Sequence, residues 1–243
     1  MYYKEYWIFM GLLLLCGLFA GWASRKVTTT YAAFRTDKTN SHMTGYDTAV
    51  RLLRANGIHD VQVGRVKGSL TDHFHPKKKI VNLSESTYGD DSVASVAVAA
   101  HEIGHVVQKE RGYLPYRIRT ALVPLTNFGS RLALPLVLIG LLLEIFGSFG
   151  GKDVGFTVAL VGVVLYGLSA LFTLVTLPVE LDASRRAREM LIEEGILTED
   201  EVYGAKKVLS AAAMTYVAAL ATSLVYFLRF ALWVLTMFGR RRD

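Results

Sequence analysis

The chain has 243 residues, of which 52% are hydrophobic, and its single cysteine excludes an internal disulfide and any cysteine-cluster metal site. A net charge of +6 would suit a nucleic-acid-binding protein, but the basic residues flank long apolar runs instead of gathering in one polar segment. The composition is therefore typical of a membrane protein with basic cytoplasmic flanks, and it argues against a nucleic-acid partner.

The first element is an uncharged run at residues 7–23, whose length is at the low end for a membrane-spanning helix. A cleaved signal peptide is the alternative, but Glu5 offsets the charge of Lys4 in the segment before the run. Arg25 and Lys26 follow the run directly, which predicts an external N-terminus and a cytoplasmic location for the next segment. Residues 1–23 are therefore expected to form an N-terminal membrane helix.

Residues 24–131 are of mixed polarity and contain the next group of short elements. The pattern predicts an amphipathic helix followed by two strands, at residues 44–56, 60–66 and 79–83. Asp90, Asp91 and Ser92 then supply negative charge and a side-chain cap, which predicts a helix over residues 93–110.

Two further apolar runs, at residues 132–149 and 154–179, are separated only by a short link at residues 150–153. They predict a transmembrane hairpin over residues 132–179. Basic residues precede and follow this hairpin, which places both of its outer ends on the cytoplasmic side: Arg117, Arg119, Arg131, Arg185, Arg186 and Arg188. Glu144 interrupts the first of the two runs and is either a functional membrane residue or an interfacial one.

The last region, residues 180–243, begins with a charged helix that is expected to end at Gly195. Thr198 and Glu201 form a capping box for a second, mostly apolar helix. Because both ends of that helix are basic, the pattern leaves open whether it spans the membrane or lies along it. The chain is therefore expected to be a mainly α membrane protein with a small β-sheet and three to four transmembrane helices.

His101-Glu102-Ile103-Gly104-His105 fits the H-E-x-x-H pattern on the helix predicted at residues 93–110. Positions i and i+4 lie on one helix face, so two imidazoles there can bind one zinc ion. The glutamate beside the first histidine can then accept a proton from the zinc-bound water. The short pattern also arises by chance, but here its helix is predicted independently from the caps and is lined by small residues.

A catalytic zinc ion usually has three protein ligands and one open position, so a third ligand is needed. No histidine follows His105 in the sequence. Glu180 is favoured because it is expected to open a helix at the cytoplasmic end of the third apolar run. Asp182 would point to a different face of that helix, so only one of these two carboxylates should bind the metal. His73 and His75 are the remaining candidates.

Three stretches resemble the YugP-like membrane zinc metallopeptidases over nearly the whole chain: TDHFHPKKKIVNLSESTYGDDSVASVAVAAHEIGHVVQ, LPVELDASRRA and KVLSAAAMTYVAAL. More distantly, the segment at residues 180–183 resembles the E-x-x-A-D segment of HtpX-like and prenyl-protein peptidases. There the first glutamate is the third zinc ligand, which implies this role for Glu180 and a zincin-like metallopeptidase domain. Ser184 stands where those relatives have an aspartate that supports a zinc-binding histidine, and Asp182 is a candidate for that supporting role.

The motif and the resemblance together predict a membrane-bound zinc-dependent endopeptidase that acts on peptides or proteins at the lipid bilayer. Residues 24–131 would form the metallopeptidase region, and residues 180–243 would supply the third ligand and the C-terminal apolar helix. His101, His105 and Glu180 would hold Zn²⁺, with Glu102 as the catalytic base. The expected location is the plasma membrane of a prokaryote, with several crossings and the catalytic region on the cytoplasmic side.

Two further roles, oxyanion stabilisation and substrate pairing, are expected from the chemistry of the side chains and the backbone. Candidates for a donor that stabilises the oxyanion are Arg185, Arg186, His73 and His75. The strand expected at residues 79–83 would be an edge strand that pairs with extended substrate near Asn82 and Ser84.

Two other functions remain open from the sequence. An intramembrane-cleaving zinc protease would need the motif helix inside the bilayer, but acidic residues before it and basic residues after it leave too short an apolar stretch. A membrane scaffold or adaptor with a structural zinc site would normally need four protein ligands, and it gives no purpose to Glu102.

Overall fold

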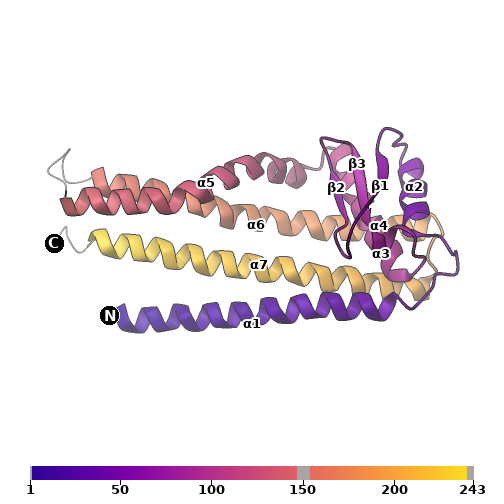
Figure 1. Cartoon of the computed structure of the whole chain (residues 1–243), viewed down its shortest axis with the longest axis horizontal. Coiled ribbons are helices and arrows are strands. Elements are labelled where there is room, and N and C mark those ends of the chain that lie inside the picture. Colours follow the sequence, from indigo (N-terminus) through magenta and orange to yellow (C-terminus); the bar gives the residue numbers. More distant parts are fainter. Residues whose placement is uncertain (1, 147–153, 240–243) are drawn as a thin grey trace. The chain divides into compact units, whose positions relative to one another are not determined.

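The computed structural model describes residues 2–146 and 154–239 and is mainly helical, with one small sheet (Figure 1). The link expected at residues 150–153 and the basic residues 240–242 lie outside the described residues. In chain order the elements are α1 (Tyr2–Phe34), α2 (Gly45–Ala55), β1 (Gln62–Val66), β2 (His73–His75), β3 (Ile80–Ser84), α3 (Glu85–Tyr88), α4 (Val93–Glu110), α5 (Leu114–Phe146), α6 (Val154–Glu193) and α7 (Glu199–Gly239).

The chain divides into two compact units, each assembled from separate segments of sequence. The first unit consists of residues 1–20, 118–177 and 217–243, and the second of residues 21–117 and 178–216. Each of the four long helices α1, α5, α6 and α7 contributes residues to both units. The polar and the strongly apolar segments of the sequence are therefore joined within continuous helices, without linkers between them.

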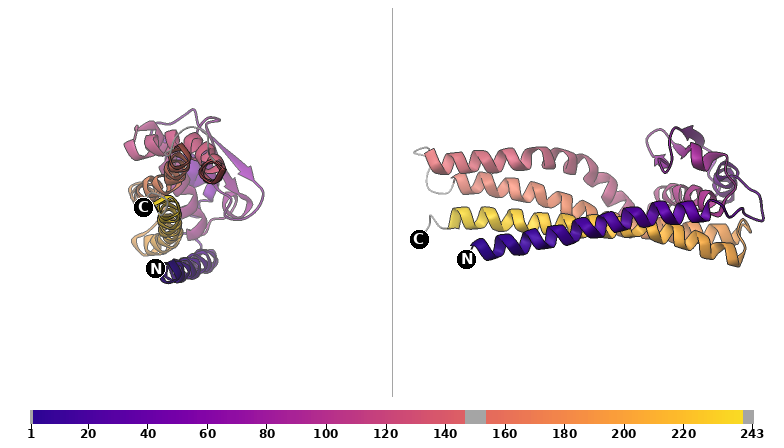
Figure 2. Two further views of the ribbon diagram at one scale, coloured as in Figure 1. Left: turned by 90° about the vertical axis from the view of Figure 1, so that its left-hand side faces the viewer. Right: turned by 60° about the horizontal axis from the view of Figure 1, so that its bottom comes forward.

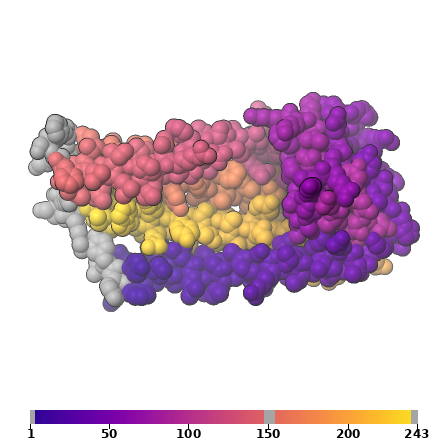
Figure 3. Space-filling model, in the orientation of Figure 1, coloured from indigo at the N-terminus to yellow at the C-terminus, as the bar shows by residue number. Residues whose placement is uncertain are grey.

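Four helices of the described chain are long and apolar enough to cross a membrane: Lys4–Phe34, Leu114–Phe146, Val154–Glu193 and Glu199–Phe238. The prediction of a mainly α membrane protein with a small sheet is confirmed. Along α1 several large apolar side chains are exposed, as a protein surface in contact with lipid would be: Trp7, Ile8, Leu14, Leu15 and Leu18. The helix itself is the indigo band in Figure 3.

Within the first unit, small residues let α5 and α6 pack backbone against backbone, and the two helices run side by side in the right-hand view of Figure 2. A Cβ atom on Gly140 would lie 2.5 Å from the carbonyl oxygen of Gly155, and one on Gly162 would lie 2.6 Å from that of Ala133. Close approach of this kind is the usual basis of helix association in membranes, where apolar burial alone provides little driving force.

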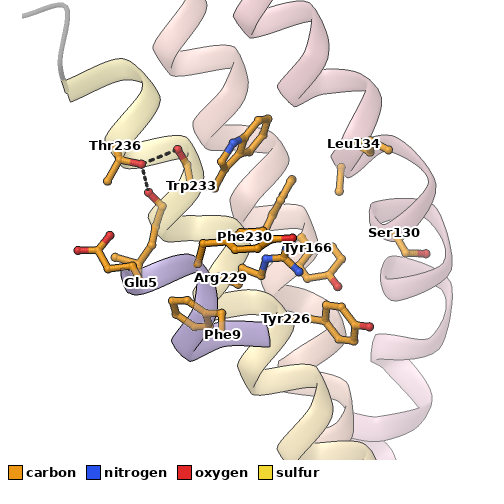
Figure 4. Close-up of a pocket in the computed structure, with 13 residues that line it drawn as sticks. Glu5, Phe9, Ser130, Leu134, Tyr166, Tyr226, Arg229, Phe230, Trp233 and Thr236 are labelled. Carbon is orange, nitrogen blue, oxygen red and sulfur yellow. Dashed lines mark hydrogen bonds between the residues drawn. The ribbon is translucent and has the colours of Figure 1, made fainter. Parts of the chain in front are cut away.

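The first unit also contains a largely apolar pocket of about 710 Å³, to which all four long helices contribute (Figure 4). Tyr6 from α1, Ser130 from α5, Tyr166 from α6 and Arg229 from α7 are among its lining residues. The guanidinium of Arg229 lies 5.7 Å from the centre of the Tyr6 ring. A cation–π contact of this kind stabilises a positive charge that the surrounding apolar helices could not solvate.

The second unit contains a three-stranded sheet in the order β1-β3-β2. β3 pairs in parallel with β1 and antiparallel with β2, with Val81 opposite both Val63 and Phe74. The expected edge strand at residues 79–83 is therefore wrong in its position, because β3 is the centre of the sheet. Within the described chain, β1 and β2 provide the outer edges. No strong local signal marks β2, which has only three residues and is followed directly by Pro76.

The core of the second unit fixes α4 in place. Leu52 from α2, Val81 and Leu83 from β3, Ile103 from α4 and Leu191 from α6 are all fully buried in one cluster. Burying each such side chain contributes about 1.5–3 kcal/mol to folding. The bounds predicted for α4 agree with the structure, and Ser92 caps the helix by accepting a hydrogen bond from the backbone N–H of Ser95.

Candidate metal centre

The site begins with a close approach of α4 to α6, which a glycine makes possible. A Cβ atom on Gly104 would lie 2.6 Å from the carbonyl oxygen of Ala183 on α6, well inside van der Waals contact. Ala97 and Ala100 on α4 and Ala187 on α6 are also fully buried. Small side chains on both helices therefore bring the two backbones together and leave the longer side chains near Gly104 to face one another.

Glu180 lies within α6, so the expectation that it opens a new helix is wrong. The helix is continuous from Val154 to Glu193 and even includes Pro178. The change from apolar to charged residues near residue 180 marks the end of the apolar run and not the end of the helix. Glu180 is only 2% exposed, so it is not a solvated acid at a helix start. A buried carboxylate requires charged or hydrogen-bonding partners.

Two histidines on α4 provide these partners. His101 Nε2 and His105 Nε2 each lie 3.3 Å from Glu180 Oε2. The centroids of the two rings are 4.8 Å apart, and the ring planes are nearly perpendicular, with an angle of 81° between them. One ligand atom from each of the three residues lies within 4.8 Å of the other two, and no other group in the described chain meets the same criterion for holding a metal ion. His73, His75 and Asp182 are therefore outside this cluster.

The opposite ring nitrogens are held by other side chains. His101 Nδ1 lies 3.2 Å from the hydroxyl of Ser184, and His105 Nδ1 lies 3.0 Å from Gln108 Oε1. An imidazole that donates from Nδ1 keeps a lone pair at Nε2, the atom that faces Glu180 in both residues. The arrangement therefore presents two imidazole nitrogens and one carboxylate oxygen, a donor set that suits Zn²⁺.

The electrostatic environment also favours a cation. Burial disfavours the charged form of His105, but the hydrogen bond to Glu180 and the negative charges of Glu180 and Glu102 outweigh burial and raise the pKa of His105. Two carboxylates next to the buried imidazole of His105 and the half-buried imidazole of His101 thus create a negative local field, which would attract a divalent metal ion.

Glu102 lies beside the cluster and faces a cleft of about 380 Å³ that His101 also lines. Its side chain is mostly buried, and within the described chain its carboxylate has no hydrogen-bond partner. The walls of the cleft are mainly aliphatic and aromatic, and none of its lining residues is a lysine or an arginine (Val27, Tyr31, Leu70, Val98, Val208, Leu209, Ala212 and Tyr216).

The proposed oxyanion donors have other partners. Arg185 Nη2 and Arg186 Nε lie 2.5 and 2.6 Å from the two carboxylate oxygens of Asp182. His73 Nδ1 lies 2.9 Å from the carbonyl oxygen of Thr71, and its Nε2 lies 3.1 Å from the amide of Asn82. These contacts direct both arginines to Asp182, and they hold His73 within its own sheet.

Gln108 is a residue that sequence reasoning missed. It is fully buried and contacts both His105 and Asp182. Its position three residues after His105 places it on the motif face of the helix, which was the available signal. It was overlooked because an amide is not a usual zinc ligand.

Comparison with known proteins points in the same direction. Residues 6–235 match a protein family described as "putative neutral zinc metallopeptidase". The chain is also 39% identical over 211 residues to the "Putative membrane protease YugP" of Bacillus subtilis (strain 168), a match that covers 87% of this chain and 89% of the relative. No solved structure matches the chain significantly.

Proposed function

The chain belongs to the neutral zinc metallopeptidase family, and on this basis we propose that it is a membrane-bound, zinc-dependent endopeptidase. It is a membrane protein and a protease by family, and zinc is the metal that the family implies. The observation that carries the finer proposal is the convergence of His101, His105 and Glu180 in one buried cluster next to Glu102.

We assign His101 Nε2, His105 Nε2 and Glu180 as the zinc ligands. Three protein ligands leave one position for water, which is the usual composition of a catalytic zinc site. When bound, zinc would lower the pKa of that water and polarise the scissile carbonyl. Ser184 and Gln108 keep the two imidazoles in the orientation that ligation requires, because they occupy the Nδ1 side of each ring.

Glu102 is the general base in this proposal. It follows His101 directly on α4, and its carboxylate faces the cleft without a hydrogen-bond partner in the described chain. It would accept a proton from the attacking water and later donate it to the amine of the leaving peptide. The apolar walls of the cleft favour a substrate with an apolar side chain next to the scissile bond.

The location of the site favours hydrolysis at the membrane surface over cleavage within the bilayer. α4 is not among the four helices of the described chain that could cross a membrane. Four crossings would place both termini on one side and residues 24–117 on the other. Arg25, Lys26, Arg185 and Arg186 flank the apolar runs on that second side, which supports a cytoplasmic catalytic region in a prokaryotic plasma membrane.

The proposal is tested with Glu102→Gln and Glu180→Ala in detergent-purified protein. Glu102→Gln should keep about one zinc ion per chain and lose nearly all hydrolysis of an unfolded protein substrate, because only the base is removed. Glu180→Ala should lose zinc. Glu193→Gln, an exposed change near the end of α6, is the control and should alter neither quantity.

Each outcome decides between an enzyme and a scaffold. Wild-type protein that binds zinc but hydrolyses no peptide bond, with Glu102→Gln indistinguishable from it, would favour a structural zinc site in a membrane adaptor. Absence of zinc from the reconstituted wild-type protein would refute the zinc-dependent mechanism.

A further inference from the structure

Gln108 lies where a polar group without a hydrogen-bond partner would destabilise the fold. Its side chain is fully buried on α4, one helical turn after His105. Its Oε1 atom accepts a hydrogen bond from His105 Nδ1 at 3.0 Å. An amide in such a place is stabilising only when both of its ends are hydrogen-bonded.

The other end of the amide determines which way it points. Gln108 Nε2 donates to the carbonyl oxygen of Val179 at 2.7 Å and to Asp182 Oδ2 at 2.9 Å. Both of these partners can only accept, so the NH₂ group must face them and the oxygen must face His105. His105 must then carry a proton on Nδ1, which leaves Nε2 as the ring nitrogen that faces Glu180 and can bind a metal ion.

Asp182 is itself held in place by two arginines. Arg186 Nε lies 2.6 Å from the same Oδ2 atom that accepts from Gln108, and Arg185 Nη2 lies 2.5 Å from Oδ1. The guanidinium of Arg186 also lies 5.6 Å from the centre of the Tyr113 ring. The Asp182 carboxylate is thus fixed as an acceptor, and it is not a member of the cluster of His101, His105 and Glu180.

We propose that Gln108 and Asp182 act as a positioning pair that sets the tautomer and ring orientation of His105 for zinc binding. The inference rests on the proposed function, since it assumes that His105 Nε2 is a ligand. It gives Asp182 a role at the metal centre without ligation, acting through Gln108 and on His105. His101 is supported separately by the hydroxyl of Ser184.

A reversal of hydrogen-bond polarity tests the pair. Gln108→Glu keeps the size and the acceptor for His105, but it removes both donors and sets a carboxylate against Asp182 and the carbonyl of Val179. Adding Asp182→Asn restores one link, because the amide introduced at position 182 can donate to the carboxylate introduced at position 108 while its oxygen still accepts from Arg185. If Gln108 only filled space, the second change would not restore zinc binding.

The measurement is the zinc dissociation constant of detergent-purified, folded protein, obtained by competition with a chromogenic chelator. Gln108→Glu should weaken zinc binding about 10- to 100-fold, the usual effect of losing a partner that orients a ligand. The double variant should bind zinc clearly more tightly than Gln108→Glu. Recovery will be partial because the Val179 carbonyl stays without its donor.

Val107→Ala is the matched control. Val107 is adjacent and similarly buried, but it belongs to the apolar core. Its truncation should lower the thermal stability while leaving the zinc dissociation constant of the folded protein unchanged.

The remaining outcomes separate this inference from the proposed function. Wild-type zinc affinity in Gln108→Glu, together with zinc loss in Glu180→Ala, would overturn the positioning role and leave the ligand set intact. No zinc binding by the wild type would overturn both. If Gln108→Glu does not fold, Asp182→Ala alone serves as the test, because it removes the acceptor for Gln108 Nε2: weaker zinc binding supports the pair, and unchanged binding refutes it.

Discussion

Among the single residues of the site, Gly104 has a role that its chemistry alone does not reveal. It binds nothing, but the approach of Ala183 at this point is what allows a carboxylate on α6 to reach two imidazoles on α4. Packing therefore constrains a middle position of the H-E-x-x-H pattern, in addition to the three positions that the pattern names.

Gly104→Ala should damage both the fold and the metal site. The added methyl group would lie 2.6 Å from the Ala183 carbonyl oxygen, so α6 must move away. Overpacking of this kind costs about 1–3 kcal/mol. We expect a lower unfolding temperature and weaker zinc binding, measured by thermal melting and chelator competition. Gly89→Ala is the control, because a Cβ atom there meets nothing within 4 Å. Wild-type zinc affinity in Gly104→Ala would contradict this account.

Ala212→Leu should narrow the cleft without changing any of the proposed metal ligands. Ala212 lies on α7 and lines the cleft together with His101 and Glu102. For peptides with a bulky apolar residue next to the scissile bond, kcat/KM should fall about 10-fold or more, while peptides with alanine there should be affected less. Zinc content should not change. Equal losses for both peptides would show that the cleft does not select by size. Ala219→Leu, at an exposed position on the same helix, is the control.

The sequence indicated the residues with obvious chemistry and only one residue, Asp182, that supports them. His101, Glu102 and His105 were proposed from their spacing, and Glu180 from its position after the third apolar run and from the resemblance. Gln108 and Ser184 depend on which atoms meet after α4 and α6 pack, and no local pattern encodes that meeting.

For the helices and strands, agreement between prediction and structure depends on local signals. The bounds of α4 were predictable because Ser92 is an explicit cap. The continuity of α6 was not, because a change in composition at Glu180 resembles a helix boundary. β2 is maintained by pairing with β3, and such pairing is invisible in three residues of sequence.

The N-terminus of α4 should make stability depend on acid pH. Burial raises the pKa of Asp90, but hydrogen bonds from Lys38, Ser92 and Ser95 outweigh it and lower that pKa below its ordinary value. Asp90 therefore stabilises the fold fully above the ordinary carboxyl range, and this contribution is lost as the pH falls through the lowered pKa.

Asp90→Asn should accordingly lower the apparent melting temperature at pH 7 by a few degrees and by less as the solution is acidified. Thermal scans between neutral and acidic pH will measure the difference between the two proteins. A constant difference at every pH would show that the charge of Asp90 is not involved. Asp200→Asn, in the first turn of α7 and exposed, is the control.

Across the whole chain, the four long helices determine the topology. Their basic flanks predict a cytoplasmic second unit, and the only cysteine makes this directly testable. In a Cys16→Ser background, Lys67→Cys introduces one thiol at an exposed position after β1. A membrane-impermeant thiol reagent should label it only after the cells are permeabilised. Labelling of Lys67→Cys in intact cells would place the catalytic region outside. Lys152→Cys, in the link expected between the two hairpin runs, is the opposite control and should be labelled without permeabilisation.

The second unit is discontinuous in sequence, and this affects the order of events during synthesis. His101 and Glu180 are separated by 79 residues, and the whole of the α5–α6 apolar pair is made between them. During translation, His101 and His105 therefore leave the ribosome long before Glu180, whose carboxylate completes the cluster. Until residue 180 has been synthesised, the nascent chain has two imidazoles and Glu102 but lacks the carboxylate proposed as the third ligand. Under the proposed function, proteolytic competence would thus be acquired only after both apolar runs of the hairpin have been made, which would spare neighbouring nascent chains from earlier cleavage.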